Sequence, residues 1–399
     1  MTTGEYRDAG AAPRGCRRAE HSMEQKTAHV ALFVPSLTVG GAQRVTTTVA
    51  NGLAERGYEV DLLLSYNRGE LAETVAGEVR VVDLETPQIP VVGIGASVPA
   101  LRSYLEREEP DVLFSAMTYA TVVVLAAAFQ LGVDTRFVGV EHTTFGRNLT
   151  LKERLVTEVA TRWYGSIDHV LAVSQGVADA VVERTRIDPE RVSVQYNPVE
   201  VADIDRLADE AVDHPWLDGD HEVVLSVGRL DSPKDYGTLV RAFAEVNRKR
   251  PATRLVIAGT GSERDQLLEL ADSLGVGEEL SLPGYVENPY RYMQRASVFA
   301  LSSRYEGLPT VLIEALACGC PTVSTDCPSG PNEFLDDGRY GRLVPVGDHE
   351  ALAEAIVGTL ERPPDSESLR ARAEAFAAPH VIDEYADFVD AQADLSGGR

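Results

Sequence analysis

Residues 29–65 read HVALFVPSLTVGGAQRVTTTVANGLAERGYEVDLLLS, which is two apolar runs joined by a longer segment of helical pattern. The runs at 29–35 and 59–65 are short and rich in Val, Leu and Phe, as strands of a buried parallel sheet are. The segment between them opens on a Gly pair and is long enough for a crossover helix. This stretch therefore predicts two parallel strands connected through a helix.

The same alternation continues along the chain in two series. The first series predicts strands at 29–35, 59–65, 79–84, 111–116, 136–142, 169–174 and 192–198. The second predicts strands at 222–230, 253–261, 280–285, 297–303, 321–326 and 341–348, followed by helices near 349–361, 365–377 and 379–393. We therefore predict an α/β protein with two Rossmann-like, doubly wound domains that face each other across a cleft, where ligands of such sheets bind.

The two series suggest a division of the chain into five parts. Residues 1–27 have no apolar stretch, so we expect a disordered tail without a signal peptide, and Met23 is a candidate start. The expected parts are that tail, an N-terminal domain at 28–200, a linker with a short helix at 201–220, a C-terminal domain at 221–377, and 378–399. We expect this last part to be a helix that packs back on the N-terminal domain, followed by a tail.

The chain is strongly acidic. Its 399 residues include 62 Asp and Glu against 37 Lys and Arg, for a formal net charge of -25. No cluster of basic residues suits nucleic acid, so we exclude nucleic-acid binding. Only four of the bases are lysines, and so acidic a surface suggests a halophilic, salt-rich cytoplasm that screens self-repulsion. Stability that is equal in molar salt and in dilute buffer would contradict this origin.

The sequence gives little support for a metal site or for a membrane-spanning segment. Cys318, Cys320 and Cys327 lie close together, but their spacing is unusual for zinc and no His is nearby, so we expect buried thiols in a reducing compartment. The uncharged stretch 112–133 is long enough to cross a bilayer. Ser, Thr, Tyr and Gln interrupt it, and we interpret it as a strand followed by a buried helix.

Glycines and basic residues stand where predicted strands end. Gly40 and Gly41 form a turn ahead of a helix, where backbone N–H groups can approach an anion, although a plain tight turn fits equally well. Arg229 ends a strand in VGRLDSPKD and Lys234 precedes the next helix. Two cations at a helix start suit a diphosphate, and a pair of surface bases is the alternative. The rarity of lysine in this chain favours a function for Lys234.

A pair of carboxylates follows the strand predicted at 297–303. In YEGLPTVLIEA, Glu306 lies in a loop and Glu314 lies eight positions later, inside an apolar helix. A solvated helix face is the ordinary interpretation of such a pair, but a carboxylate among apolar neighbours needs a partner or a shifted pKa. Backbone N–H groups at the opening of this helix are candidates to bind phosphate or sugar hydroxyls, namely those of Gly307, Leu308 and Thr310.

With these residues in order, residues 28–395 resemble the family-4 retaining glycosyltransferases of the GT-B fold. The resemblance rests on Glu306 and Glu314 as E-x7-E, on VGRL…PKD, and on the segments GGAQRV, EHTT, AVSQG and NPV. It implies that the N-terminal domain is on the acceptor side and that the C-terminal domain binds the nucleotide sugar. The family's second glycine-rich turn is commonly a GG pair, whereas SGPNE, with Ser329, Gly330 and Glu333, stands here.

The resemblance also implies roles for the candidate residues. Arg229 and Lys234 would bind the donor diphosphate, Glu314 the ribose hydroxyls, and Glu306 the transferred sugar. Gly40 and Gly41 would lie against the phosphates and the acceptor. His142, at the end of its predicted strand, would line the sugar pocket, and the alternative is a hydrogen-bonded structural histidine.

The implied activity is transfer of a sugar from a nucleotide diphosphosugar to a hydroxyl of a glycan or a lipid-linked acceptor, with retention. UDP is the donor nucleotide expected from family frequency. Because fixed cations can stabilise the leaving diphosphate, we expect no obligatory metal and no cofactor. A nucleotide-sugar 2-epimerase and a non-catalytic nucleotide-sugar-binding subunit are the alternatives.

We expect a cytoplasmic protein that can also lie at the inner face of the membrane. Residues 146–165 combine Arg and Lys with Leu and Trp163, as an interfacial helix does. Acidic residues dilute the charge of this segment, and an ordinary domain helix is the alternative.

Overall fold

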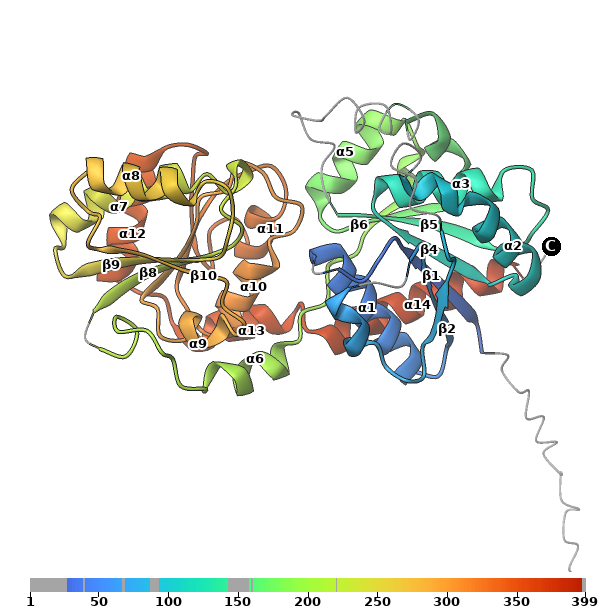
Figure 1. Cartoon of the computed structure of the whole chain (residues 1–399), viewed down its shortest axis with the longest axis horizontal. Coiled ribbons are helices and arrows are strands. Elements are labelled where there is room, and N and C mark those ends of the chain that lie inside the picture. Colours follow the sequence, from blue (N-terminus) through green and yellow to red (C-terminus); the bar gives the residue numbers. More distant parts are fainter. Residues whose placement is uncertain are drawn as a thin grey trace, which may run out of the picture.

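The computed structural model describes residues 27–38, 40–66, 69–86, 93–142, 158, 161–219 and 221–396. They form two α/β domains that lie side by side along the longest axis of the molecule (Figure 1). Each domain has a parallel sheet with helices on both faces. This arrangement confirms the predicted fold class. The N-terminal tail and most of residues 146–165 lie outside the described residues.

The N-terminal sheet has seven parallel strands in the order β3-β2-β1-β4-β5-β6-β7. They are β1 (His29–Val34), β2 (Glu59–Leu64), β3 (Arg80–Asp83), β4 (Val112–Ala116), β5 (Arg136–Glu141), β6 (His169–Ala172) and β7 (Val192–Val194). The strand order reverses direction between β1 and β4. A crevice at the carboxyl ends of these two strands is where such sheets bind ligands.

Helices cover both faces of this sheet because its strands carry apolar side chains on both sides. They are α1 (Gly41–Glu55), α2 (Val98–Glu108), α3 (Thr118–Ala128), α5 (Gln175–Thr185) and α14 (Ala378–Ser396). In β1, Val30, Leu32 and Val34 pack with α1 and α14. Ala31 and Phe33, which alternate with them, pack with α2 and α3.

The C-terminal sheet has six parallel strands in the order β10-β9-β8-β11-β12-β13. They are β8 (Glu222–Val227), β9 (Thr253–Ala258), β10 (Leu280–Gly284), β11 (Val298–Leu301), β12 (Thr322–Thr325) and β13 (Arg342–Val344). Here the order reverses between β8 and β11, so the ligand crevice of this domain is expected where these two strands end.

The helices of the C-terminal domain also form two layers. They are α6 (Val201–Ala208), α7 (Tyr236–Lys249), α8 (Arg264–Ser273), α9 (Tyr290–Met293), α10 (Thr310–Ala317), α11 (Pro331–Leu335), α12 (His349–Glu361) and α13 (Ser366–Glu374). One layer, with α7, α8 and α12, packs on Val224 of β8. The other, with α10 and α13, packs on Val223 and Leu225.

Short 3-10 turns connect several of these elements. They are η1 (Glu70–Thr74), η2 (Gly93–Ser97), η3 (Tyr164–Ser166), η4 (Pro189–Arg191) and η5 (Ser232–Lys234). Each predicted strand is present, and the largest differences are at carboxyl ends. The strands predicted at 192–198 and 341–348 end at Val194 and Val344. Pro345 directly follows Val344 and lacks a backbone N–H for the ladder.

The chain passes between the domains twice, and the two passages are hydrogen-bonded to each other. Val199 N donates to Phe376 O at 3.0 Å, and Ala378 N donates to Val199 O at 2.8 Å. The ring of Tyr196 packs edge-on against Phe376 at 5.2 Å between centroids. The segment between the first passage and β8 contains α6, which packs on α9 and α10 of the C-terminal domain.

After the second passage, α14 packs against α1 and the N-terminal sheet (Figure 1). Val381, Ile382, Tyr385 and Val389 are buried in that core. The two helices approach closely at Gly52, where an added Cβ would lie 2.8 Å from two carbon atoms of Ile382. The absence of a side chain at Gly52 therefore determines how closely α14 packs.

Gly52→Ala is expected to destabilise the protein by about 1 kcal/mol. Crowding in a packed core costs about 1–3 kcal/mol, while Ala gains about 1 kcal/mol over Gly in a helix. Urea unfolding measures the difference. In an Ile382→Ala background the crowding is absent, and the same substitution should then be stabilising. Equal effects in the two backgrounds would show that Ile382 is not the cause.

Candidate active site

A lysine and a carboxylate meet where β8 and β11 end. Lys234, the last residue of η5, donates from Nζ to Glu306 Oε1 at 2.6 Å. Ser303 Oγ lies 2.5 Å from the same oxygen and donates to it. The side chains of Lys234 and Glu306 are 18% and 13% exposed, so water screens their interaction only in part. The sequence predicted both residues for the site, and the fold brings them into contact.

Backbone contacts join the two loops that carry this pair. Ser302 Oγ donates to Lys234 O at 2.8 Å, and Arg304 N donates to Pro233 O at 2.8 Å. The Arg304 guanidinium pairs with the Asp235 carboxylate at 2.9 Å. The loops after β8 and β11 therefore behave as one unit, which holds the Lys234 ammonium in a defined place.

Arg229 takes a different position. Its guanidinium lies 3.2 Å from Asp231 Oδ2, and its side chain is 80% exposed. In this structure Arg229 therefore faces solvent on the loop after β8. It lies on the same loop as Lys234, which follows β8 beside the reversal of strand order.

Glu314 lies within α10 and is half-buried, surrounded by the buried Leu312, Ile313 and Ala315. Burial raises the pKa of Glu314, while the positive charge of Arg44 and a hydrogen bond from Thr310 act in the opposite direction. Arg44 is an exposed residue of α1, in the other domain. Arg44 was not among the predicted site residues, although its place in GGAQRV, in the first turn after the Gly pair, was a usable signal.

The predicted backbone N–H sites differ from one another. Gly40 caps α1 with an extended backbone, and an added Cβ at Gly41 would meet no atom within 4 Å. Open space beside Gly41 lets a ligand approach the start of α1. Gly307 and Leu308 are buried in the turn before α10. The N–H of Thr310 donates to Leu308 O at 2.9 Å, so this amide has a partner within its own turn, and its binding of a ligand stays a prediction.

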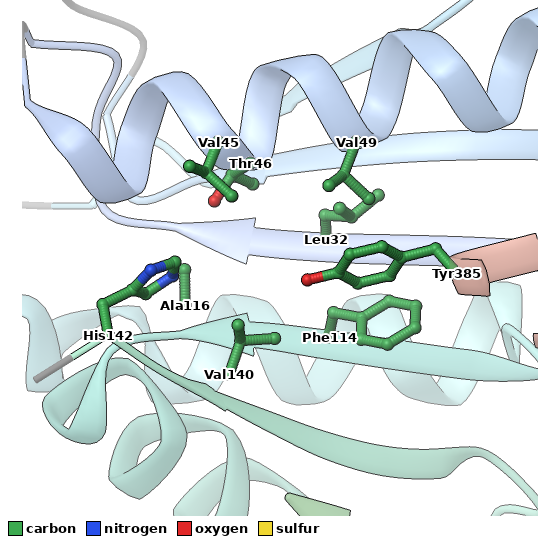
Figure 2. A pocket seen from close by; sticks show the side chains of 9 residues that line it. All are labelled: Leu32, Val45, Thr46, Val49, Phe114, Ala116, Val140, His142 and Tyr385. Atoms are coloured by element: carbon green, nitrogen blue, oxygen red, sulfur yellow. The ribbon is translucent and has the colours of Figure 1, made fainter. Parts of the chain in front are cut away.

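His142 directly follows β5 and lines a small, mostly apolar cavity of about 20 Å³ between β5 and α1 (Figure 2). Tyr385 of α14 directs its hydroxyl into the same cavity. Within the described part of the chain, the buried His142 Nε2 atom has no hydrogen-bond partner. Burial lowers the pKa of His142 to about 4, so the imidazole is neutral at pH 7. A neutral ring with an unused nitrogen can bind a hydroxyl group.

Glu141, the last residue of β5, is 1% exposed. Thr118 Oγ1 donates to its Oε2 at 2.7 Å, and the Tyr164 hydroxyl donates to its Oε1. Burial raises the pKa of Glu141 to about 7, although both hydrogen bonds lower it. This carboxylate was not among the predicted site residues, although it directly precedes His142 in EHTT.

The buried Glu141 predicts a pH-dependent stability. Its folded pKa of about 7 lies above the unfolded value of about 4.3, so the folded state binds more protons in that window. The free energy of unfolding should therefore fall as pH rises from about 4.3 to 7 because of this group. Urea unfolding across this range should show that Glu141→Gln loses that component of the slope. Parallel curves for variant and wild type would contradict the assignment.

Three cysteines are buried, as the sequence predicts. Cys318, Cys320 and Cys327 are buried and free, and burial raises the pKa of Cys318 and of Cys327 to about 12. Among the described residues there is no group of three or more His, Cys, Asp or Glu arranged to hold a metal ion. Nor is any helix in the described ranges long and apolar enough to cross a membrane.

Two family models match the chain side by side. Residues 39–203 match the model described as Glycosyltransferase Family 4, and residues 210–376 match Glycosyl transferases group 1. These matches and the two facing Rossmann-like domains define a glycosyltransferase of the GT-B fold. The chain belongs to the family-4 glycosyltransferases.

Relatives of known name extend over most of the chain. The N-acetylgalactosamine-N,N'-diacetylbacillosaminyl-diphospho-undecaprenol 4-alpha-N-acetylgalactosaminyltransferase of Campylobacter jejuni is 29% identical over 355 residues, 83% of this chain and 89% of that protein. The lipopolysaccharide core biosynthesis glycosyltransferase LpsE of Rhizobium meliloti is 28% identical over 322 residues, 79% of this chain and 84% of that protein.

Solved structures share the fold. HepE of Anabaena in complex with UDP superimposes with a TM-score of 0.73 at 20% identity, covering 91% of this chain and 100% of that one. Sucrose-phosphate synthase of Thermosynechococcus elongatus also has a TM-score of 0.73, at 19% identity, over 90% of this chain and 98% of that one. At these identities the likeness establishes the fold alone.

Proposed function

We propose that the protein transfers a sugar from a nucleotide diphosphosugar, with UDP as the expected nucleotide, to a hydroxyl of a lipid-linked or glycan acceptor, with retention of anomeric configuration. The contact between Lys234 and Glu306 at the carboxyl ends of β8 and β11 is the observation that carries this proposal. The name of the Campylobacter relative, which acts on a diphospho-undecaprenol acceptor, and the UDP in HepE support it.

Lys234 would stabilise the leaving diphosphate. As the bond from the sugar to the phosphate breaks, negative charge grows on the diphosphate, and a fixed ammonium is worth most where that charge develops. Arg229, on the same loop, would add a guanidinium fork once it turns from Asp231 to the phosphates. We propose that these two cations make a metal ion unnecessary, so the transfer rate should be unchanged by EDTA.

Glu306 and His142 would hold the transferred sugar. Glu306 already accepts from Lys234 and Ser303 through one oxygen, which leaves Oε2 to bind a sugar hydroxyl. His142 would offer its neutral ring from the other domain. In this proposal the acceptor hydroxyl attacks the face of the sugar that the diphosphate leaves, and its proton passes to a departing phosphate oxygen.

Glu314 would bind the ribose hydroxyls, since a carboxylate accepts two hydrogen bonds from a diol. Glu314→Ala is therefore expected to abolish transfer, and calorimetric titration with UDP should show that binding of the nucleotide is lost. The circular dichroism spectrum should stay that of the wild type. Glu354 is a matched control, because it is an exposed glutamate of α12, and Glu354→Ala should bind UDP normally. Normal UDP binding by Glu314→Ala would refute the role.

The proposed location is the cytoplasm, with a peripheral contact at the inner face of the membrane. Of the segment 146–165 that suggested this contact, the described residues include Arg162 and Trp163, which are exposed. Liposome flotation of the wild type against Trp163→Ala tests the contact. Equal flotation of the two proteins, or none, would remove the membrane contact from the proposal.

A panel of nucleotide sugars tests the proposed function as a whole. The protein is incubated with each donor, with and without lipid and glycan extracts, and the products are identified by mass spectrometry. Nucleoside diphosphate release that depends on acceptor supports transfer, and NMR of the product reports whether the anomeric configuration is retained. An altered sugar without acceptor would indicate a 2-epimerase, and binding without turnover would indicate a binding subunit.

A further inference from the structure

The turn and short helix after β12 reach across to the N-terminal domain. Glu333 of α11 accepts hydrogen bonds from Gln175 N at 2.8 Å and from Gly176 N at 3.2 Å. These two residues open α5, and α11 and α5 face each other across the space between the domains (Figure 1). A carboxylate of one domain is thus bound by backbone N–H groups of the other.

This contact completes the hydrogen bonding of the first turn of α5. The N–H groups at the very start of a helix have no acceptor inside it. Val177 N donates to Ser174 Oγ at 3.2 Å, and Ala178 N makes the first bond of the helix itself, to Ser174 O at 3.0 Å. The N–H groups of Gln175 and Gly176 remain, and Glu333 receives both. The positive end of the helix dipole adds an attraction for the charged carboxylate.

The two domains approach very closely beside this hydrogen bond. An added Cβ at Gly176 would lie 2.6 Å from Ser329 Cβ and 2.8 Å from Ser329 Cα. Ser329 itself has a left-handed backbone with φ of 68°, which is uncommon outside glycine. Any side chain at Gly176 would therefore push α5 away from the turn before α11.

The same turn contacts the loop that carries Glu306. Ser329 Oγ lies 2.6 Å from Glu306 O, to which it can donate. Gly330 packs so closely that an added Cβ would lie 3.2 Å from Gly307 O. The contacts therefore run without a gap from α5 through Ser329 to Glu306, and from Glu306 to Lys234.

We propose that Glu333 is a positioning residue for sugar transfer: through α5 it holds the N-terminal domain in register with the donor site of the C-terminal domain. This inference rests on the proposed function. His142 belongs to one domain, and Lys234 and Glu306 belong to the other. These side chains therefore surround the same sugar only when the two domains have the correct relative position. A misplacement of about 1 Å can lower a rate about 10²-fold.

Aromatic packing makes a second connection between the domains. The positioning role of Glu333 can therefore be distinguished from merely holding the two domains together. Tyr196, ahead of the first passage, packs on Phe334 and Phe376 at 6.3 and 5.2 Å between centroids. The Tyr196 hydroxyl also donates to Glu333 Oε2 at 3.5 Å. The ring contacts themselves do not involve that carboxylate, so we expect them to remain when it is removed. We therefore expect Glu333→Ala to remain folded and to bind nucleotide, while the domains lose their fixed relative position.

The test compares Glu333→Ala, Glu333→Gln and Gly176→Ala with the wild type and with Glu354→Ala as control. Distances between the domains are measured by double electron–electron resonance. The spin labels are attached at Glu183→Cys and Gln266→Cys, two exposed positions on α5 and α8, in a protein that also carries Cys16→Ser so that this cysteine is not labelled. Glu333→Ala and Gly176→Ala should broaden and lengthen the distance distribution. Their kcat should fall about 10²-fold while the Kd for UDP stays that of the wild type. Glu333→Gln keeps one acceptor oxygen and should recover part of the rate.

The outcomes distinguish the two proposals. If the wild type transfers sugar and Glu333→Ala has an unchanged kcat or an unchanged distance distribution, the positioning role is overturned. If the UDP affinity of Glu333→Ala falls with its kcat, Glu333 acts on donor binding and the role is likewise overturned. If the wild type itself transfers no sugar from any donor, the proposed function fails. An unchanged distance distribution in Glu333→Ala would then overturn the interdomain contact as well.

Discussion

Lys234→Ala should lower kcat for sugar transfer by about 10²–10³-fold, which is the usual cost of removing one group that stabilises developing negative charge. The Lys234 ammonium is held by Glu306 at 2.6 Å and is only 18% exposed, so it has a fixed place beside that carboxylate. Arg229 on the same loop is 80% exposed and paired with Asp231, and it cannot substitute without rearrangement. Steady-state kinetics with the donor found in the nucleotide-sugar panel measure the loss.

The control is another lysine of the same domain. Lys249 is exposed at the end of α7, so Lys249→Ala should have wild-type kinetics. Lys234→Arg should recover little, because a planar guanidinium does not occupy the place of a compact ammonium. A rate near that of the wild type in Lys234→Ala, with a native circular dichroism spectrum, would refute the assignment of this residue to the leaving diphosphate.

Asp61→Ala should lower the free energy of unfolding by about 3–5 kcal/mol, the usual cost of breaking a buried ion pair by removing one partner. Asp61 lies on β2 with no exposed surface, and it accepts from His29 Nε2 at 2.9 Å and from Arg80 Nε at 2.6 Å. The Tyr104 hydroxyl donates to it as well. Without the carboxylate, the buried Tyr104 hydroxyl and the largely buried His29 ring lose this acceptor, whereas the half-exposed Arg80 keeps Glu108 at 3.0 Å. Urea unfolding at pH 7 measures the loss.

The pH dependence gives this prediction a second readout. Burial by itself raises the pKa of Asp61, but hydrogen bonds from Arg80, His29 and Tyr104 outweigh burial and hold that pKa well below its ordinary range. Its stabilising contribution is therefore present above the unfolded pKa of about 3.9 and is lost as pH falls through the folded value. The difference between wild type and Asp61→Ala should shrink below about pH 4.

His29 shifts in the opposite direction from Asp61. The hydrogen bond to Asp61 raises the pKa of His29, so its contribution is present below the unfolded value of about 6.5 and is lost as pH rises through the folded pKa. The matched control is Glu59→Gln on the same strand, where the side chain is exposed and should have little effect. If Asp61→Ala is as stable as Glu59→Gln, the buried cluster contributes nothing to stability.

Much of the fold could be predicted because its strands and helices follow from residue patterns within short windows of the sequence. The strands needed only runs of apolar residues between turn residues, and each predicted strand is present, including β8 and β11 beside the site. The ends of strands were less accurate: Pro345, for example, ends pairing of β13 that an apolar pattern alone would continue. Lys234 and Glu306 could be selected because both follow a strand and because lysine is rare in this chain.

Other parts of the site could not be read from the sequence because they depend on partners distant along the chain. Arg44 acts on Glu314 from the other domain, 270 positions earlier by residue number, and no spacing rule connects them. Glu141 is notable only because Tyr164 and Thr118 surround it. The hydrogen bond from the amide of Thr310 to Leu308 O is likewise invisible in a pattern of residue types.

The sequence by itself determined the two parallel sheets, their crossover helices and the residue types at the strand ends, because these follow from apolar periodicity and turn chemistry within short windows. Only the tertiary structure decided which of those residues meet. It brought Lys234 into a hydrogen bond with Glu306 and Glu333 into hydrogen bonds with the first turn of α5. It also brought Tyr385 of the last helix to the cavity that His142 lines. The physical reason is that these contacts join side chains that are close in space but far apart in the chain. They depend on how whole domains pack, which no short window of sequence contains.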